Sequence, residues 1–289
     1  MVKYICKEGD YMTIMEAIKK GMIELKNENI ESPKLKSRLL IQFILNKPRQ
    51  YVIVNDMQEL NLAEQKKYFD LIAELKCGFP LEYITHQKEF MKLNFFVNEN
   101  VLIPRQDTEI LVEEVISIAK NINANKILDM CTGSGAIAVS LAKYLPQTEI
   151  VAVDISSDAL KIAKKNAINN EVENQITFIN SDLFVNLNEE KFDIIVSNPP
   201  YIKRNVIEYL DKEVKKEPHI ALDGGDDGLY FYKKIISESY QYLKYNGSLC
   251  LEIGFDQKID VIELIENEEK FDNIYSKKDL YDNDRIIIA

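Results

Sequence analysis

Apolar residues recur at helical spacing through the first 78 positions of the chain. The stretch "TIMEAIKKGMIEL" places four apolar side chains on one face of a helix: Ile14, Ile18, Met22 and Leu25. Thr13 and Glu16 stand three residues apart at its start, which is the spacing of a capping box. The pattern predicts an amphipathic helix that begins after Thr13.

Two further stretches carry helix signals at their ends. "SPKLKSRLLIQFIL" opens with Ser32 as the expected N-cap and Pro33 at the first helical position. "NLAEQKKYFDLIAELKCG" has a second capping box in Asn61 and Glu64, and Gly78 is placed to end the helix. We therefore expect a small helical N-terminal domain over residues 1–78, and nothing in it resembles a catalytic motif.

The pattern changes between residues 79 and 106. "EFMKLNFFVNENVLIP" is rich in residues that favour strands and contains "NEN", which favours a turn. The segment predicts a β-hairpin that links two domains, with its turn at "NEN".

From residue 107 to 289, apolar runs alternate with helical patterns. The helix "DTEILVEEVISIAK" comes first, and the strands "KILDMC", "EIVAVDI", "ITFINSD", "FDIIVSN" and "GSLCLEIG" follow. This alternation predicts an α/β fold with a mostly parallel sheet covered on both faces. The final "NIYSKKDLYDNDRIIIA" predicts two strands joined at "DND", which would add one antiparallel strand to the sheet.

Composition and charge narrow the class of protein. Of 289 residues, 46% are hydrophobic and 29% charged, as in an ordinary soluble globular protein. There is no apolar run long enough to span a membrane and no apolar core of a signal peptide at the N-terminus, so we expect a cytoplasmic protein. The net charge of −11 argues against a protein that grips nucleic acid, because phosphate binding needs a basic surface.

Cysteine and histidine usage gives no sign of a metal site or a disulfide. Cys6, Cys77, Cys131 and Cys250 are far apart, and none belongs to a C-x-x-C pair. The two histidines lack ligand spacing. We expect free thiols and no bound metal.

A glycine-rich turn lies between a predicted strand and a predicted helix. In "ILDMCTGSGAIAVSLA", Gly133 and Gly135 let the backbone turn sharply and approach a ligand. Asp154 ends the next strand, 21 positions after Gly133, where an acid suits the two hydroxyls of an adenosine ribose. Because Gly133, Gly135 and Ala138 also match G-x-G-x-x-A, a nicotinamide enzyme stays open at this point.

The acids near this turn favour a cationic ligand. Asp182 follows a third strand, where it could accept from an adenine amino group with Leu183 against the ring, and Asp129 stands in the strand before the turn. A pyrophosphate would need positive charge, and no Lys or Arg lies between Lys126 and Lys143. S-adenosylmethionine, with its sulfonium and ammonium groups, suits three acids better.

The fourth predicted strand ends in "SNPPY", on the sheet edge where open α/β sheets bind ligands. The side-chain oxygen of Asn198 and the carbonyl of Pro199 could each accept one hydrogen of a planar NH2 group. That would hold the nitrogen in line with a methyl donor and stabilise charge developing on it. Pro200 stiffens the turn, and Tyr201 could stack on a flat substrate.

N-P-P-Y after a fourth strand looks like the amino-methyltransferases that use S-adenosylmethionine. The segments "GFPLEYITHQKEFMKLNFFVNENVLIPRQDTEILVE" and "EPHIALDGGDDGLYFYKKII" resemble more narrowly the release factor glutamine methyltransferases, the PrmC/HemK family. The resemblance covers nearly all of residues 78–289. It implies a Rossmann-like class I methyltransferase domain that methylates the glutamine of the GGQ motif in peptide chain release factors.

The resemblance also implies roles for individual residues. The methionine part of S-adenosylmethionine would be held by a loop of five residues: Cys131, Thr132, Gly133, Ser134 and Gly135. The product would be S-adenosylhomocysteine. Asp154 would hold the ribose, and Asp182 with Leu183 the adenine. The substrate glutamine would lie against Asn198, Pro199, Pro200 and Tyr201, with Arg105 shaping the pocket. Asn198, Pro199 and Tyr201 would be catalytic, and Asn198 would also contact the donor.

Three positions depart from the family pattern. Cys131 stands where the family often has Gly, Gln106 where other residues are common, and His86 where Gly is frequent. Cys131 is small enough not to block binding, whereas Gln106 and His86 bear on how the substrate docks.

Several alternatives stay open. The N-P-P-Y segment that would hold the acceptor nitrogen would also suit an enzyme that methylates adenine in nucleic acid, or one that methylates a glutamine of a ribosomal protein. A nicotinamide-dependent dehydrogenase would bind NAD instead of S-adenosylmethionine. A non-enzymatic binding module would need neither an intact donor pocket nor an intact N-P-P-Y segment. We expect a monomer that acts on release factors, without a direct nucleic-acid or membrane partner.

Overall fold

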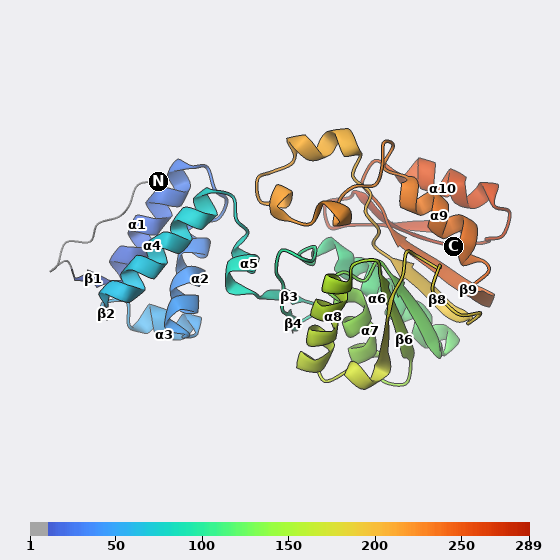
Figure 1. Ribbon diagram of the computed structural model, residues 1–289, viewed down its shortest axis with the longest axis horizontal. Helices are drawn as coiled ribbons and strands as arrows, with labels where there is room; N and C mark the ends of the chain where they lie inside the picture. Colours follow the sequence, from blue (N-terminus) through green and yellow to red (C-terminus); the bar gives the residue numbers. More distant parts are fainter. Residues whose placement is uncertain (1–10) are drawn as a thin grey trace. The chain divides into compact units, whose positions relative to one another are not determined.

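The computed structural model describes residues 11–289, which form two compact units. The first unit comprises the described part of Met1–Thr85 together with Lys212–Lys216, and the second comprises His86–Asp211 and Glu217–Ala289. The chain therefore leaves the second unit after Asp211 and returns to it at Glu217. Figure 1 traces the elements of each unit along the chain.

The first unit is helical. Its helices are α1 (Ile14–Asn27), α2 (Pro33–Leu45), α3 (Arg49–Val54), α4 (Leu62–Lys76) and α5 (Leu81–Thr85). Two short strands, β1 (Met12–Thr13) and β2 (Glu59–Leu60), pair antiparallel. Both predicted capping boxes are present, before α1 and before α4. Gly78 follows the end of α4 with φ +78°, which confirms the predicted stop.

The predicted start of α2 is confirmed, and two features of the helical unit lay outside the prediction. Ser32 precedes α2 and Pro33 is its first residue, but Ser32 has φ +50° and its side chain makes no capping hydrogen bond. A serine that caps a helix normally has an extended backbone, which brings its hydroxyl to the free N–H groups of the first turn. Ser32 is left-handed instead, so the sequence predicts its position but not the missing hydrogen bond. The short helices α3 and α5 were not predicted, since five or six residues show too little periodicity.

Helices α1, α2 and α4 pack around a common apolar core. At Gly21 of α1, a Cβ atom would lie 2.2 Å from the hydroxyl of Tyr68 and 2.9 Å from Oγ of Ser37. Ser37 and Tyr68, both buried, are hydrogen bonded to each other at this point. The glycine thus lets a polar pair from α2 and α4 lie directly against α1.

A β-hairpin opens the second unit, as predicted, but its turn is elsewhere. Strands β3 (Lys88–Phe90) and β4 (Leu93–Phe95) pair antiparallel around Met91 and Lys92, whose φ angles are +49° and +59°. Two successive left-handed residues match a tight hairpin turn that usually contains Asn or Gly. The "NEN" segment makes a separate turn, in which Asn98 Oδ1 accepts from the N–H of Asn100.

The second unit is built on a seven-stranded sheet of order β10-β11-β9-β8-β5-β6-β7. Its strands are β5 (Lys126–Met130), β6 (Glu149–Asp154), β7 (Ile176–Asn180), β8 (Phe192–Ser197), β9 (Leu243–Glu252), β10 (Tyr275–Lys278) and β11 (Asp284–Ile288). β11 pairs antiparallel with both β9 and β10, while β5 to β9 pair parallel to one another. The predicted mostly parallel sheet with one antiparallel strand is confirmed.

Five longer helices accompany the sheet: α6 (Asp107–Ile122), α7 (Ala136–Tyr144), α8 (Ser157–Asn169), α9 (Tyr230–Ser239) and α10 (Lys258–Asn267). Short 3-10 helices lie at Glu173–Gln175, Arg204–Tyr209, Val214–Lys216 and His219–Ala221.

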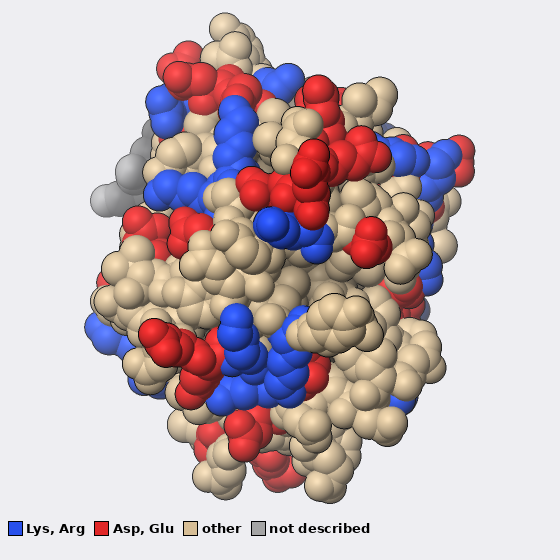
Figure 2. All heavy atoms as spheres, turned by 90° about the vertical axis from the view of Figure 1, so that its right-hand side faces the viewer, with Lys and Arg blue, Asp and Glu red and all other residues tan. Residues whose placement is uncertain are grey.

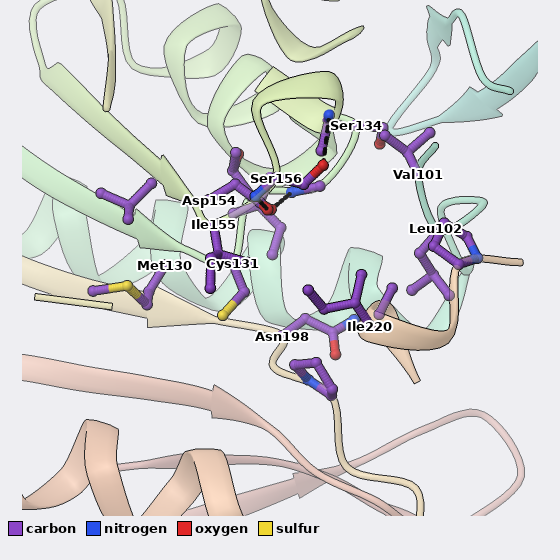
Figure 3. Close-up of a pocket in the computed structure, with 18 of the residues that line it drawn as sticks. Val101, Leu102, Met130, Cys131, Ser134, Asp154, Ile155, Ser156, Asn198 and Ile220 are labelled. Carbon is purple, nitrogen blue, oxygen red and sulfur yellow. Dashed lines mark hydrogen bonds between the residues drawn. The ribbon is translucent and has the colours of Figure 1, made fainter. Parts of the chain in front are cut away.

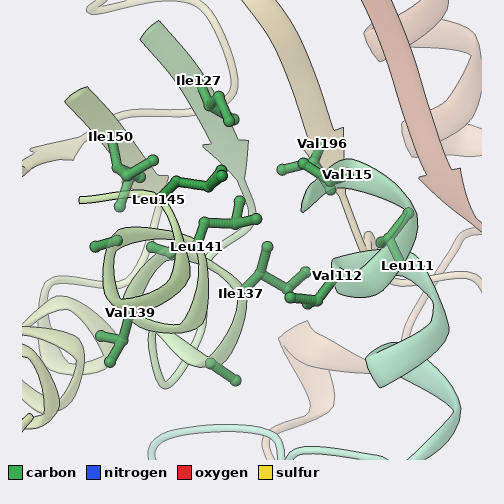
Figure 4. Close-up of a cluster of buried hydrophobic side chains, with 14 of the residues drawn as sticks. Leu111, Val112, Val115, Ile127, Ile137, Val139, Leu141, Leu145, Ile150 and Val196 are labelled. Carbon is green, nitrogen blue, oxygen red and sulfur yellow. The ribbon is translucent and has the colours of Figure 1, made fainter. Parts of the chain in front are cut away.

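Successive side chains of the strands point alternately into two hydrophobic cores, one on each face of the sheet. Ile127, Ile150 and Val196 pack with side chains of α6 and α7 (Figure 4). Their sequence neighbours Leu128 and Val151 point to the opposite face, where α9 and α10 cover the sheet. Because both faces are covered, the ends of the strands are the places left for a site.

On the face of the molecule shown in Figure 2, acidic and basic side chains are interspersed in small groups. Among residues 11–289, no helix combines the length and apolar character needed to span a membrane.

Candidate active site

The glycine-rich turn leads from β5 into α7. Cys131, Gly133 and Gly135 all have positive φ, at +64°, +54° and +80°. A Cβ on Gly135 would lie 3.0 Å from Cβ of Ala163 in α8, so this glycine is needed for packing. A Cβ on Gly133 would meet no atom within 4 Å, so this glycine leaves its side of the loop open to a ligand.

Asp154, at the end of β6, holds this turn from the side. One carboxylate oxygen accepts from the N–H of Gly133 at 2.8 Å, and the other accepts from the N–H of Ser156 at 2.8 Å (Figure 3). Burial raises the pKa of Asp154, and these backbone hydrogen bonds oppose the rise. Each oxygen keeps a second acceptor direction, which a ligand hydroxyl could use.

Asp129 lies beneath the turn and is fully buried. Its Oδ2 accepts from the hydroxyl of Thr132 at 2.5 Å and from the N–H of Ala138 at 3.1 Å. Its Oδ1 is buried without a hydrogen-bond partner among residues 11–289. Burial raises the pKa of Asp129 to about 7.

A cavity opens at the carboxyl ends of β5, β6 and β8 and receives most of the residues singled out in the sequence. Those that line it are Arg105, Cys131, Thr132, Gly133, Ser134, Asp154, Asp182, Leu183, Asn198 and Pro200. In Figure 3, Asn198 lies between Cys131 and Ile220, with Asp154 and Ser156 farther along the cavity. The structure therefore brings the glycine turn, the acid after β6 and the end of β8 into one space.

Four of the residues singled out in the sequence do not line the cavity: Asp129, Gly135, Pro199 and Tyr201. Tyr201 packs instead against the hydrophobic core beneath α9. Burial, followed by the nearby Glu252, raises its pKa to about 12, so the phenol is neutral at physiological pH. Its expected stacking on a substrate stays a prediction.

The segment after Pro218 packs directly on the clamp formed by Asn198, Pro199, Pro200 and Tyr201. The N–H of Ile202 donates to the carbonyl of Leu222 at 3.0 Å, and the N–H of Gly224 donates to the carbonyl of Ile202 at 2.8 Å. A Cβ on Gly224 would lie 2.7 Å from the backbone carbon of Tyr201. The glycines of "LDGGDDGL" thus allow two backbones to lie in contact, and these contacts fix the course of the clamp.

Arg105 is anchored by Glu217, which comes just before that segment. Its Nη2 atom donates to Glu217 at 2.6 Å, and the N–H of Ile103 donates to the other carboxylate oxygen at 3.2 Å. The carboxylate of Glu217 is only 2% exposed, so it fixes the backbone before α6 and the guanidinium together.

The charges around the cavity suit a cationic adenosine compound. The pKa of the Cys131 thiol is raised above its ordinary value by burial first, and also by the charges of Asp154, Asp129 and Asp182. Arg105 is the one cationic side chain among the described residues that line the cavity. A sulfonium and an ammonium group would offset Asp154 and Asp182, the two acids that line the cavity, whereas a pyrophosphate would be repelled by them. The residues present therefore fit S-adenosylmethionine.

Sequence reasoning missed other residues of the site. Ile155 and Ser156 follow Asp154, and Ile220 and Phe231 come from the segment around α9; all four line the cavity. Their position next to a predicted strand end was the available signal for Ile155 and Ser156. Thr108, in the first turn of α6, also lines the cavity and accepts a hydrogen bond from Asn198, and no local pattern marks it.

Comparisons with known proteins indicate a methyltransferase. A family model described as "Methyltransferase small domain" matches residues 105–215, and one described as "PrmC N-terminal domain" matches residues 16–85. A solved structure of the hMettl16 catalytic domain in complex with a MAT2A 3'UTR hairpin is 15% identical, with a TM-score of 0.57. It covers 86% of this chain and 90% of that one. At that identity the likeness concerns the fold alone.

Two curated relatives are much more similar, and both are named release factor glutamine methyltransferase. The one from Clostridium acetobutylicum is 43% identical over 96% of this chain and 98% of its own length. The one from Clostridium botulinum is 41% identical over 96% of this chain and 99% of its own length. This near full-length identity shows that the chain belongs to the release factor glutamine methyltransferase family of S-adenosylmethionine-dependent enzymes.

Proposed function

We propose that this protein transfers a methyl group from S-adenosylmethionine to the side-chain amide nitrogen of the glutamine in the GGQ motif of peptide chain release factors. The near full-length identity of 43% to a release factor glutamine methyltransferase supports this substrate. The position of Asn198 in the same cavity as Asp154 supports the chemistry, because acceptor clamp and donor site must adjoin.

When bound, S-adenosylmethionine supplies an electrophilic methyl group on a sulfonium that is a good leaving group. The work of the protein is to bind and orient. Asp154 would accept from the ribose hydroxyls, Asp182 from the adenine amino group, and Leu183 would lie against the adenine ring. Cys131, Thr132, Gly133, Ser134 and Gly135 would surround the methionine part.

The acceptor nitrogen of an amide is a poor nucleophile because its lone pair is delocalised. Oδ1 of Asn198 and the carbonyl of Pro199 would accept its two hydrogens and aim the lone pair at the methyl group. Fixing that geometry removes much of the barrier, and the two acceptors stabilise positive charge developing on nitrogen. Pro200 keeps the turn rigid, and Tyr201 braces it from the core side.

We further propose that the first unit, which matches the PrmC N-terminal domain, docks the release factor. We also propose that the enzyme is a monomer. Release factors act on ribosomes, so the enzyme would work in the cytoplasm. The net charge of −11 favours a protein substrate over nucleic acid.

The test is transfer of a labelled methyl group to a purified release factor, beside DNA, RNA and ribosomal protein in parallel reactions. Label should enter the release factor, and replacement of its GGQ glutamine should abolish the transfer. Label in nucleic acid or ribosomal protein alone would contradict the proposal.

A further inference from the structure

Behind the clamp, the side chain of Asn198 is hydrogen bonded to α6. Its Nδ2 atom donates to the hydroxyl oxygen of Thr108 at 3.2 Å. Thr108 is only 4% exposed and belongs to the first turn of α6. Because the hydroxyl oxygen accepts from Asn198, its own hydrogen must be donated to another acceptor.

The neighbouring acceptor is Glu252, the last residue of β9, which is 1% exposed. Side-chain hydrogen bonding from Thr108, and to a smaller extent from Asn198, stabilises the charged form of this carboxylate. Its Oε2 atom is buried without a hydrogen-bond partner among residues 11–289. Glu252 is not among the residues that line the cavity.

We propose that Thr108 and Glu252 are positioning residues that fix which way the Asn198 side-chain amide faces. In this series of hydrogen bonds, Asn198 Nδ2 donates to Thr108 Oγ1, and Thr108 Oγ1 donates to Glu252. Nδ2 is thereby held toward α6, and Oδ1 is left to face the acceptor nitrogen. The inference rests on the proposed function for its catalytic consequence, but the arrangement itself can be tested without a substrate.

The direction matters because an amide can be turned over at little steric cost. A turned Asn198 would present N–H groups to the N–H groups of the acceptor amide, and the clamp would be lost. An ionised carboxylate can only accept hydrogen bonds, so it forces Thr108 to donate toward it and to accept from Asn198. A glutamine at position 252 could donate or accept and would leave both directions open.

Several charged or titratable groups face Glu252. Arg285 comes from β11, Asp107 from α6, Tyr201 from the clamp and Tyr232 from α9, whose hydroxyl donates to the backbone oxygen of Glu252 at 2.8 Å. Burial raises the pKa of Glu252 to about 7, opposed by Thr108 and by Arg285. A protonated carboxyl can donate as well as accept, so the fixed direction weakens as the pH falls through about 7.

The first experiment needs no substrate. The side-chain amide hydrogens of Asn198, assigned by their absence in Asn198→Ala, are followed by hydrogen exchange in NMR spectra of the full chain. We expect Thr108→Val, which keeps the shape but removes the hydroxyl, to speed their exchange about tenfold, as loss of one hydrogen bond implies. Exchange at the rate of the unchanged protein would overturn the proposal.

The second experiment measures kcat and KM on a release factor. We expect Thr108→Val to lower kcat about three- to tenfold with KM within about twofold, and Thr108→Ser to restore it. Glu252→Gln should lower kcat less, and the double variant should be no slower than Thr108→Val because both act through one chain of hydrogen bonds. If the fold-change in kcat of the double variant equals the product of the fold-changes of the two single variants, the proposed arrangement is contradicted.

A matched control is Thr148→Val. Thr148 is buried and donates to the carbonyl of Ala124 at 2.9 Å, at the far end of the sheet. It should lower the melting temperature without changing kcat. In the unchanged protein kcat should rise with pH through about 7, and in Glu252→Gln that rise should be absent. If the unchanged protein does not methylate release factors, the proposed function fails, while the exchange rates still decide the arrangement.

Discussion

The Nε2 atom of Gln257 lies 3.1 Å from the backbone oxygen of Tyr201, to which it donates a hydrogen bond. The same atom donates to the carbonyl of Gly228 at 3.1 Å, and Oε1 accepts from the N–H of Gly254 at 2.9 Å. Gln257 is only 3% exposed. One buried amide therefore ties the last residue of the clamp to the segment that packs on it and to the turn after β9.

We predict that Gln257→Leu lowers the free energy of unfolding by about 2 to 3 kcal/mol, because buried carbonyls and an N–H lose their partner. It should also lower kcat, since the clamp is less well fixed. Urea unfolding and steady-state kinetics measure the two effects. The control is Gln175→Leu, whose amide donates to the carbonyls of Leu145 and Thr148 at 2.7 Å; it should lose stability and keep kcat.

Asn198→Ala should abolish methyl transfer while donor affinity stays within about tenfold, because one neutral hydrogen bond contributes roughly 1 kcal/mol to binding. Labelled-methyl transfer and calorimetry with S-adenosylmethionine measure the two quantities. Asn170→Ala is the control, since that side chain donates to the carbonyls of Asn94 and Asn166 and does not line the cavity. Normal turnover by Asn198→Ala would remove this residue from the mechanism.

Much of the fold was predictable because local signals agreed with the final packing. The capping boxes at Thr13 and Asn61 marked helix starts, and apolar runs such as "FDIIVS" marked strands buried on both faces. Asp154 and Asn198 could be placed near each other since both follow parallel strands, whose carboxyl ends share one edge.

What escaped prediction depends on tertiary contacts. Met91 and Lys92 make a left-handed turn without Gly or Asn, so their sequence points to the wrong turn residues. Thr108 and Glu252 are far apart in sequence and meet Asn198 only after β8, β9 and α6 have packed. The one local sign was an acid at the end of the otherwise apolar "LCLE", which is costly to bury without a purpose.

Asp154→Ala should weaken S-adenosylmethionine binding about ten- to hundredfold. A carboxylate that accepts from ribose hydroxyls makes charge-assisted hydrogen bonds, and this one also holds the N–H of Gly133 in the turn. Isothermal titration calorimetry measures the affinity. Asp158→Ala is the control, because that exposed acid of α8 pairs with Lys161 on the surface; equal affinities in the two variants would contradict the role of Asp154.

Cys131→Gly should leave donor affinity unchanged and should not destabilise the protein. Cys131 has φ +64°, a left-handed conformation that costs a non-glycine residue about 1 to 2 kcal/mol and that glycine adopts freely. The larger entropy of an unfolded glycine offsets part of that gain. Thermal unfolding measures the balance, and a loss of more than about 1 kcal/mol would mean that the Cys131 side chain contributes packing of its own.

Asp129→Asn should reduce the pH dependence of stability. The folded pKa of about 7 lies above the ordinary value of 3.8 for an aspartate, so between these values the folded protein holds a proton that the unfolded chain has lost. The free energy of unfolding therefore falls as the pH rises toward 7, by up to about 1.4 kcal/mol per pH unit for one group, and levels off above it. Glu252 contributes a fall of the same sign, so Asp129→Asn should remove part of the slope and Glu252→Gln another part. Urea unfolding at pH 5, 6, 7 and 8 measures the slopes, and an unchanged slope in Asp129→Asn would show that Asp129 is ionised throughout.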